Sequence, residues 1–228
     1  MGPPRRARAF RTGSGGIPMN EVLTTRRLAL FGAIGPVVFV GVVIVVTFLE
    51  WDFLHARGWH LVQDSRVVYP STTAMGPYGL LQTLNFLQIG VAVIAVALGL
   101  WRTVTPRPRV GTAFVVLAGV AFLLSSFTTD GTNGTPTTWH GTIHALAFLL
   151  LVFATLIGAL VIAVQLRKDP AWRLVAYVAP VVSIVLVVSL FLTGAVRQAG
   201  GLLSVFSILA MLGWYALLGW RVLILTPK

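Results

Sequence analysis

The sequence has no cysteine and few charged residues for its length. The absence of cysteine from 228 residues excludes a disulfide framework, a thiolate metal site and a cysteine nucleophile. Charged residues make up 10% of the chain, whereas about a quarter is usual in a soluble domain. Hydrophobic residues make up 57%, and the mean hydropathy is +0.89. Lipid rather than water is therefore the expected solvent around most of this chain.

The sequence signatures of nucleotide chemistry are also missing. The chain has no phosphate-binding loop, dinucleotide fingerprint, kinase motif set or Gly-x-Ser-x-Gly elbow, so ordinary nucleotide chemistry has no support. The net charge of +11 could suggest nucleic acid as a partner. The arginines, however, lie between long apolar runs rather than on a soluble basic face, which excludes that partner.

Six apolar runs predict an all-α bundle of six transmembrane helices. Each run is near the roughly 20 residues that cross about 30 Å of hydrocarbon. Helices are expected rather than strands, because a helix satisfies its own backbone hydrogen bonds in lipid. Residues 1–27, rich in Arg, Gly, Pro and Ser, are predicted to form a disordered basic cytoplasmic arm. The six-helix membrane domain is predicted at 28–225, with helices at 28–49, 79–101, 110–127, 141–164, 174–194 and 202–225.

Lysine and arginine are unevenly divided between the two sides of the predicted bundle. The side with the excess is expected to be cytoplasmic, which predicts a multi-pass plasma-membrane protein with both termini inside. Membrane lipids are its expected partners, and the sequence identifies no protein partner. The opposite side carries only Arg57, Arg66 and Arg197. The predicted cytoplasmic side carries Arg5, Arg6, Arg8, Arg11, Arg26, Arg27, Arg102, Arg107, Arg109, Arg167, Lys168, Arg173, Arg221 and Lys228.

Most polar side chains of the predicted spans fall in the outer half of the membrane. Buried polar groups in lipid need partners or water, so this distribution predicts an outward-facing polar pocket above a largely dry floor. The loop from Asp52 to Tyr78 is long enough to close over that pocket. The outer-half residues include Glu50, Asp52, Gln82, Asn85, Gln88, Ser125, Ser126, Thr128, Thr129, Asp130, Thr138, His140, Thr142, His144, Ser189, Thr193, Ser204 and Ser207.

His140 and His144 are the candidates for metal chemistry, together with Asp130. Two histidines four residues apart lie on one helical face, a spacing in which two imidazoles bind one metal ion. Zinc held by these three residues would activate water for attack on an ester or amide, with Ser71 or Glu50 assisting in proton transfer or oxyanion stabilisation. The catalytic candidates are thus Asp130, His140, His144 and Ser71. The alternative is that both histidines only form hydrogen bonds.

Four further residues are candidates for substrate binding. Arg197 is the cation of a short outer turn and is predicted to bind a lipid phosphate or to pair with Glu50 or Asp130; the alternative is a surface arginine. Gln82 and Asn85 lie close to one helical face with Gln88. The alternative for these amides is hydrogen bonding between helices. The substrate-binding candidates are Arg197, Glu50, Gln82 and Asn85.

Two groups of motifs stand out: the first is Tyr69-Pro70-Ser71, Gly76, Tyr78-Gly79, Asn85-Phe86 and Gly90, and the second is Phe127-Thr128-Thr129-Asp130 and His140-Gly141-x-x-His144. Together they resemble a family of bacterial polytopic membrane proteins, domain of unknown function 998 (DUF998). This resemblance implies the membrane architecture and assigns no activity. Thr128 stands where the family typically has proline. More distantly, Ser71, Asp130, His140 and His144 are similar by type to the residues around zinc in alkaline ceramidase-like membrane hydrolases.

The leading functional interpretation is an integral plasma-membrane protein whose outward polar pocket binds a lipid or another amphiphile. One alternative is a zinc-dependent intramembrane hydrolase. Another is a transporter of small molecules, which is disfavoured because transporters place substrate groups near the midplane and the predicted spans have no charged residue there. The last is a non-catalytic membrane assembly partner.

Overall fold

The computed structural model describes residues 19–62, 68–130, 138–196 and 199–227, which are helical with short connections and contain no strand. The long helices are α1 (Met19–Leu49), α3 (Gly79–Thr103), α4 (Arg109–Leu124), α5 (Trp139–Leu166), α6 (Arg173–Ala195) and α7 (Gly200–Leu225). Three short helices lie at the ends of the bundle: α2 (Trp51–Ala56), and the 3-10 helices η1 (Ser71–Met75) and η2 (Pro170–Trp172).

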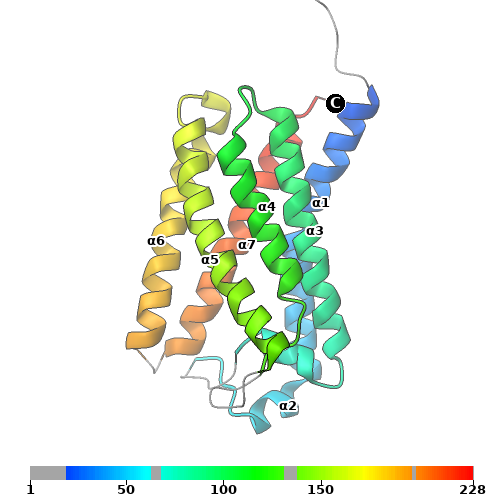
Figure 1. The fold of residues 1–228 in the computed structure, drawn as a ribbon, viewed down its shortest axis with the longest axis vertical. Coiled ribbons are helices and arrows are strands. Elements are labelled where there is room, and N and C mark those ends of the chain that lie inside the picture. Colours follow the sequence, from blue (N-terminus) through cyan, green and yellow to red (C-terminus); the bar gives the residue numbers. More distant parts are fainter. Residues whose placement is uncertain (1–18, 63–67, 131–137, 197–198, 228) are drawn as a thin grey trace, which may run out of the picture.

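The long helices form a closed ring in chain order (Figure 1). Each packs against the next, α7 packs back against α1, and α3 also touches α7 across the ring. Neighbouring helices run antiparallel, which is the usual geometry of a helix bundle. Both ends of the described chain therefore lie together, where Arg26 Nη1 donates to the backbone oxygen of Pro227 at 3.4 Å. We call this the C-terminal end and the opposite one the α2 end.

The predicted all-α architecture is confirmed for the described residues, and five of their helices are long and apolar enough to cross a membrane. The run predicted at 110–127 forms a helix, α4, but its 16 residues make it shorter than those five. Helix α1 begins at Met19, within the segment predicted as an arm, because its first turn carries Glu21, whose charge suits a helix N-terminus. Residues 1–18 of the predicted arm lie outside the described part of the chain.

Glycines allow the helices to approach closely at several crossings. Side chains at Gly90 of α3 and Gly119 of α4 would each meet the other's carbonyl oxygen, at 2.8 and 2.9 Å. A side chain at Gly219 of α7 would lie 2.6 Å from the backbone nitrogen of Ala33 in α1. Small residues at such crossings are the usual means of packing helices in lipid.

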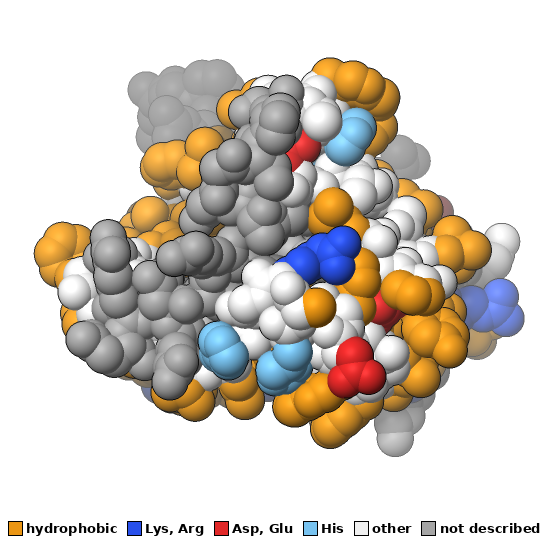
Figure 2. Space-filling model, turned by 90° about the horizontal axis from the view of Figure 1, so that it is seen from below, with side chains coloured by type: hydrophobic (Ala, Val, Ile, Leu, Met, Phe, Trp, Pro, Cys, Tyr) orange, Lys and Arg blue, Asp and Glu red, His pale blue; other side chains and the backbone are white. Residues whose placement is uncertain are grey.

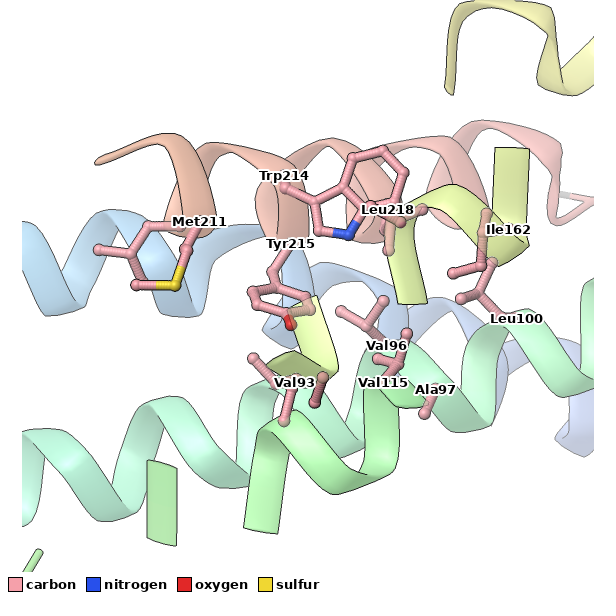
Figure 3. Close-up of a cluster of buried hydrophobic side chains, with 14 of the residues drawn as sticks. Val93, Val96, Ala97, Leu100, Val115, Ile162, Met211, Trp214, Tyr215 and Leu218 are labelled. Carbon is pink, nitrogen blue, oxygen red and sulfur yellow. The ribbon is translucent and has the colours of Figure 1, made fainter. Parts of the chain in front are cut away.

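The half of the bundle near the C-terminal end has a tightly packed apolar core (Figure 3). Trp214 and Tyr215 of α7 belong to this core and are almost fully buried, and the ring of Tyr215 lies against Phe122 of α4. Tyr215 shares a 2.7 Å hydrogen bond with Thr155, whose hydroxyl donates to the Leu151 carbonyl oxygen. The Tyr215 hydroxyl therefore donates to Thr155, and the pair is satisfied without water. Aliphatic residues fill the space around it: Val93, Val96, Ala97, Leu100, Val115, Ile162 and Leu218.

Histidine and basic residues are unevenly divided between the two ends of the bundle. The view onto the α2 end shows hydrophobic side chains around much of the rim, with histidine, acidic and basic side chains among them (Figure 2). All four histidines belong to segments at this end, as does Arg57. The other described basic residues belong to segments at the C-terminal end: Arg26, Arg27, Arg102, Arg107, Arg109, Arg167, Lys168, Arg173 and Arg221.

Candidate functional site

A cavity of about 290 Å³ lies inside the α2-end half of the bundle. All six long helices contribute to its wall, and so does the segment between α2 and η1. Its walls are mainly aromatic and aliphatic: Phe39, Trp59, Leu61, Val68, Tyr69, Pro70, Phe86, Phe122, Phe148, Leu151, Leu190, Val205, Ile208 and Met211. Its polar side chains come from Ser71, Ser125, His144, Thr193, Ser204 and Ser207.

Ser71 and His144 form the polar contact at the centre of this site. Ser71 begins the 3-10 helix η1, whereas His144 lies in the second turn of α5. The Oγ of Ser71 is 2.8 Å from Nε2 of His144, and both residues are buried. The fold therefore brings together two residues that are 73 positions apart in the sequence.

The second ring nitrogen of His144 fixes which atom donates in this pair. Nδ1 lies 2.8 Å from the carbonyl oxygen of Phe127. A carbonyl only accepts, so Nδ1 carries the proton, and in the neutral ring Nε2 then has a free lone pair. Ser71 consequently donates its hydroxyl proton to Nε2. The ring of Phe86 packs edge-on against the imidazole, with 5.9 Å between centroids, and holds its plane.

Asp130 holds the first turn of α5 rather than the cavity wall. Its carboxylate accepts the backbone N–H of Thr138 at 3.2 Å and the Thr138 hydroxyl at 2.5 Å. Thr138 is the N-cap of α5, since its side chain accepts the N–H of Gly141 at 3.1 Å. Any side chain at Gly141 would overlap the Asp130 carboxylate. The negative charge is thus placed at a helix N-terminus, where it is stabilising.

His140 belongs to the same capping arrangement. Its Nδ1 lies 2.8 Å from the carbonyl oxygen of Thr128 and 3.0 Å from Oγ1 of Thr138. The carbonyl accepts the Nδ1 proton, so this ring ties the segment after α4 to the start of α5. His140 therefore contacts the backbone leading to Asp130, while His144, one turn further along, contacts Ser71.

Glu50 has an equivalent role at α3. This carboxylate is almost fully buried, and its Oε1 accepts the backbone N–H of Tyr78, the N-cap of α3, at 2.6 Å. A side chain at Gly76 would overlap it. Two acidic residues at the α2 end thus each lie against a glycine at the beginning of a long helix. The structure places Glu50 outside the described cavity lining, in a capping contact instead.

Gln82 and Asn85 lie between helices, also outside the described cavity lining. The side-chain nitrogen of Asn85 donates to the carbonyl oxygen of Phe39 in α1 at 3.0 Å and to Oε1 of Gln82 at 3.3 Å. Both amides are fully or almost fully buried. These contacts match the alternative interpretation of the pair, hydrogen bonding between helices.

The proposed zinc ligands are not arranged as a metal site. Within the described residues, no group of three His, Asp or Glu side chains is placed to hold a metal ion. The physical reason is that His144 uses both ring nitrogens in hydrogen bonds, whereas Asp130 and His140 share Thr138 at the start of α5. Arg197, the fourth substrate-binding candidate, lies outside the described residues.

The described residues between α2 and η1 bring two aromatic side chains, Trp59 and Tyr69, to the cavity wall. Trp59 is buried against Leu54 and stacks near Tyr69, with 5.1 Å between ring centroids. The Tyr69 hydroxyl is 2.9 Å from Oγ1 of Thr47, which donates its own proton to the Val43 carbonyl. Burial raises the pKa of the Tyr69 phenol more than the Thr47 contact lowers it, so Tyr69 stays protonated at neutral pH and donates to Thr47.

A match to a protein-family model identifies the family of this chain. The family model described as "Protein of unknown function (DUF998)" matches residues 33–221, most of the bundle from α1 to α7. The chain belongs to the DUF998 family. No curated protein and no solved structure matches it. The resemblance predicted from the motifs around Ser71, Asp130 and His144 is therefore confirmed, and the function has to be inferred from the site.

The sequence indicates most polar residues of the site but not the groups that organise them. Thr138 is expected only as an outer-half polar residue, although a threonine directly before a helical run is a typical N-cap signal. The carbonyl of Phe127 had no signal at all, because any residue type supplies a carbonyl. These two groups set the direction of α5 and the tautomer of His144.

Proposed function

We propose that this DUF998 protein is a six-span plasma-membrane protein that binds a lipid or a similar amphiphile in its α2-end cavity. In this proposal the α2 end faces outward and both termini are cytoplasmic. The observation that carries it is the cavity itself, an apolar chamber with the polar Ser71–His144 contact in its wall. Such a lining suits a molecule with an apolar chain and one polar group.

The charge distribution supports the proposed orientation. The described basic residues gather at the C-terminal end, except Arg57, and an excess of Lys and Arg favours the cytoplasmic side. Helix α4 is taken as the sixth span. Its 16 residues rise about 24 Å, and a short span is accommodated by local thinning of the bilayer at modest cost.

A second, smaller cavity supports a ligand that arrives from the bilayer. Its volume is about 170 Å³, and it lies between α1 and α7. It shares five lining residues with the larger cavity: Phe39, Tyr69, Pro70, Val205 and Ile208. Ile44 and Leu209, also in its lining, are 51% and 43% exposed on the outside of the bundle. The two cavities thus share a wall, and movement of the side chains in that wall would open a lateral path from the lipid-facing surface to Ser71, which suits an acyl chain better than a water-soluble solute.

Filling this path tests the proposal. Val205 lines both cavities, so Val205→Trp is expected to exclude the chain, whereas Val187→Trp on the exposed face of α6 is the matched control. The measurement is native mass spectrometry of protein purified in a mild detergent. We expect a bound lipid on the wild type and on Val187→Trp, and its loss in Val205→Trp. A wild type without bound lipid, or equal occupancy in the two variants, contradicts the proposal.

A further inference from the structure

We propose that Ser71 is a nucleophile and His144 its general base, and that the pair transfers the acyl group of an ester-bearing amphiphile. This inference rests on the proposed amphiphile-binding cavity and adds a reaction to it. The geometry meets the requirement for an activated serine: the hydroxyl lies within hydrogen-bond reach of the base, and a third group orients that base. Here the third group is the carbonyl of Phe127.

The hydroxyl of Ser71 differs from the other hydroxyls that line the cavity. Those of Ser125, Thr193, Ser204 and Ser207 each donate to a backbone carbonyl four residues earlier in their own helix, at 2.7 to 3.1 Å. A backbone carbonyl accepts a hydrogen bond but does not act as a base, so these hydroxyls are not activated. The proton of Ser71 is directed at an imidazole lone pair, and imidazole is the side chain most often used to accept a proton in catalysis.

The surroundings of the pair favour an apolar acyl donor. Phe39, Phe122, Phe148 and Leu151 line the same cavity as His144, so an apolar chain can occupy this cavity with its ester carbonyl at Ser71. Ser71 lies in η1, outside the long helices, where its hydroxyl faces the cavity rather than the backbone of a preceding turn. The sequence placed both residues on one side of the membrane, and the fold supplies the contact.

The reaction runs in two balanced steps. In the first, Oγ of Ser71 attacks the ester carbonyl as its proton moves to Nε2 of His144; the bond to the alcohol oxygen breaks, and the alcohol leaves with that proton. In the second, water attacks the acyl-serine, gives its proton to Nε2, and releases the carboxylic acid as Ser71 Oγ regains a proton. The Nδ1–H of His144 keeps its hydrogen bond to the Phe127 carbonyl oxygen throughout, and this bond stabilises the imidazolium that forms.

A long-chain alkyl fluorophosphonate tests the nucleophile directly. The serine oxygen bonds to its phosphorus and fluoride leaves, which adds a fixed mass to the protein. We expect one adduct on purified full-length protein, mapped by peptide analysis to Ser71. Ser71→Ala abolishes it, and His144→Gln slows it by about 100-fold or more, the usual contribution of a general base. The matched control Ser183→Ala removes a buried hydroxyl of α6 that lies outside the described cavity lining and donates to the Ala179 carbonyl oxygen, and we expect it to label at the wild-type rate.

A second variant covers the case in which Ser71→Ala fails to fold. The chain has no cysteine, so Ser71→Cys and Ser207→Cys each create a single thiol in the same cavity. A thiol beside His144 forms thiolate more readily, and we expect Ser71→Cys to react with iodoacetamide at least about 10-fold faster than Ser207→Cys. Adding His144→Gln removes the difference.

The outcomes separate this inference from the proposed function. No adduct on the wild type, an adduct elsewhere than Ser71, or equal thiol rates overturns the nucleophile. Bound lipid in native mass spectra of the same preparations, with no labelling of Ser71, leaves the amphiphile cavity standing alone. A wild-type protein without bound lipid contradicts the proposed function itself.

Discussion

The two halves of this bundle contain the same kind of polar contact in opposite surroundings. Tyr215 and Thr155 form a hydrogen bond in a packed apolar core, and Thr155 in turn donates to the backbone carbonyl of Leu151. Ser71 and His144 pair with an equally short bond at the wall of a cavity. The first contact lies outside the lining of both described cavities, while the second lies in the wall of a chamber. The contact becomes a candidate for chemistry because of the space beside it.

The halves also differ in what holds their helices together. Near the C-terminal end, glycine crossings and filled aliphatic layers bring the helices into contact. Near the α2 end, the buried carboxylate of Glu50 at the start of α3 and the half-buried one of Asp130 at the start of α5 organise the chain around a cavity. Packing stabilises one half, and polar contacts position the other.

Two leucine-to-alanine substitutions, one in each half, test most directly whether the two halves differ in packing. Leu218 is fully buried in the packed half, whereas Leu190 lines the cavity and is 37% exposed. We expect Leu218→Ala to cost about 2–5 kcal/mol because it leaves a void in a close-packed core. Leu190→Ala should cost about 1 kcal/mol, since less apolar surface is lost. Reversible unfolding in detergent micelles measures both, and equal losses would mean that the two halves are packed alike.

Removing the N-cap of α5 tests the contribution of polar contacts at the α2 end, and its effect on stability is expected to be smaller. Thr138→Ala deletes the N-cap hydroxyl that joins Asp130 to Gly141, and N-cap losses cost about 0.5–2 kcal/mol. Thr142→Ala is the control, because this exposed threonine donates only to the Thr138 carbonyl, and exposed substitutions change stability by about 0.5 kcal/mol or less. The same unfolding assay compares them. A control as costly as Thr138→Ala would show that the cap adds nothing specific.

The fold was predictable because lipid leaves few alternatives for a long apolar run. Residues 79–101 and 202–225 were predicted as spans and form the cores of α3 and α7. The ends were harder to predict, since capping rather than hydropathy sets them. Helix α1 begins at Met19, and α5 begins at Trp139, directly after its N-cap Thr138. Helix α4 ends at Leu124, before the predicted 127, where Ser125 takes the C-cap position.

The site was predictable only as a set of residues on one side. Asp130, His140 and His144 are close in sequence, which left both zinc binding and simple hydrogen bonding open; the rotation of α5 directs His144 toward η1 and leaves Asp130 at the helix start. Glu50 was predicted to bind substrate; its contact with Tyr78 depends on Gly76, which leaves room for the carboxylate. Such pairings depend on the paths of the connecting segments, which hydropathy and spacing do not encode.

The central claim, a cavity in the half that faces away from the cytoplasm, is tested most directly by single cysteines in this cysteine-free chain. His60→Cys places an exposed thiol at the α2 end, and Thr105→Cys places one between α3 and α4. Each variant is treated in intact cells with a membrane-impermeant maleimide, then again after permeabilisation. We predict that His60→Cys is labelled in intact cells and that Thr105→Cys is labelled only after permeabilisation. The reverse pattern would turn the cavity toward the cytoplasm and contradict the proposed function.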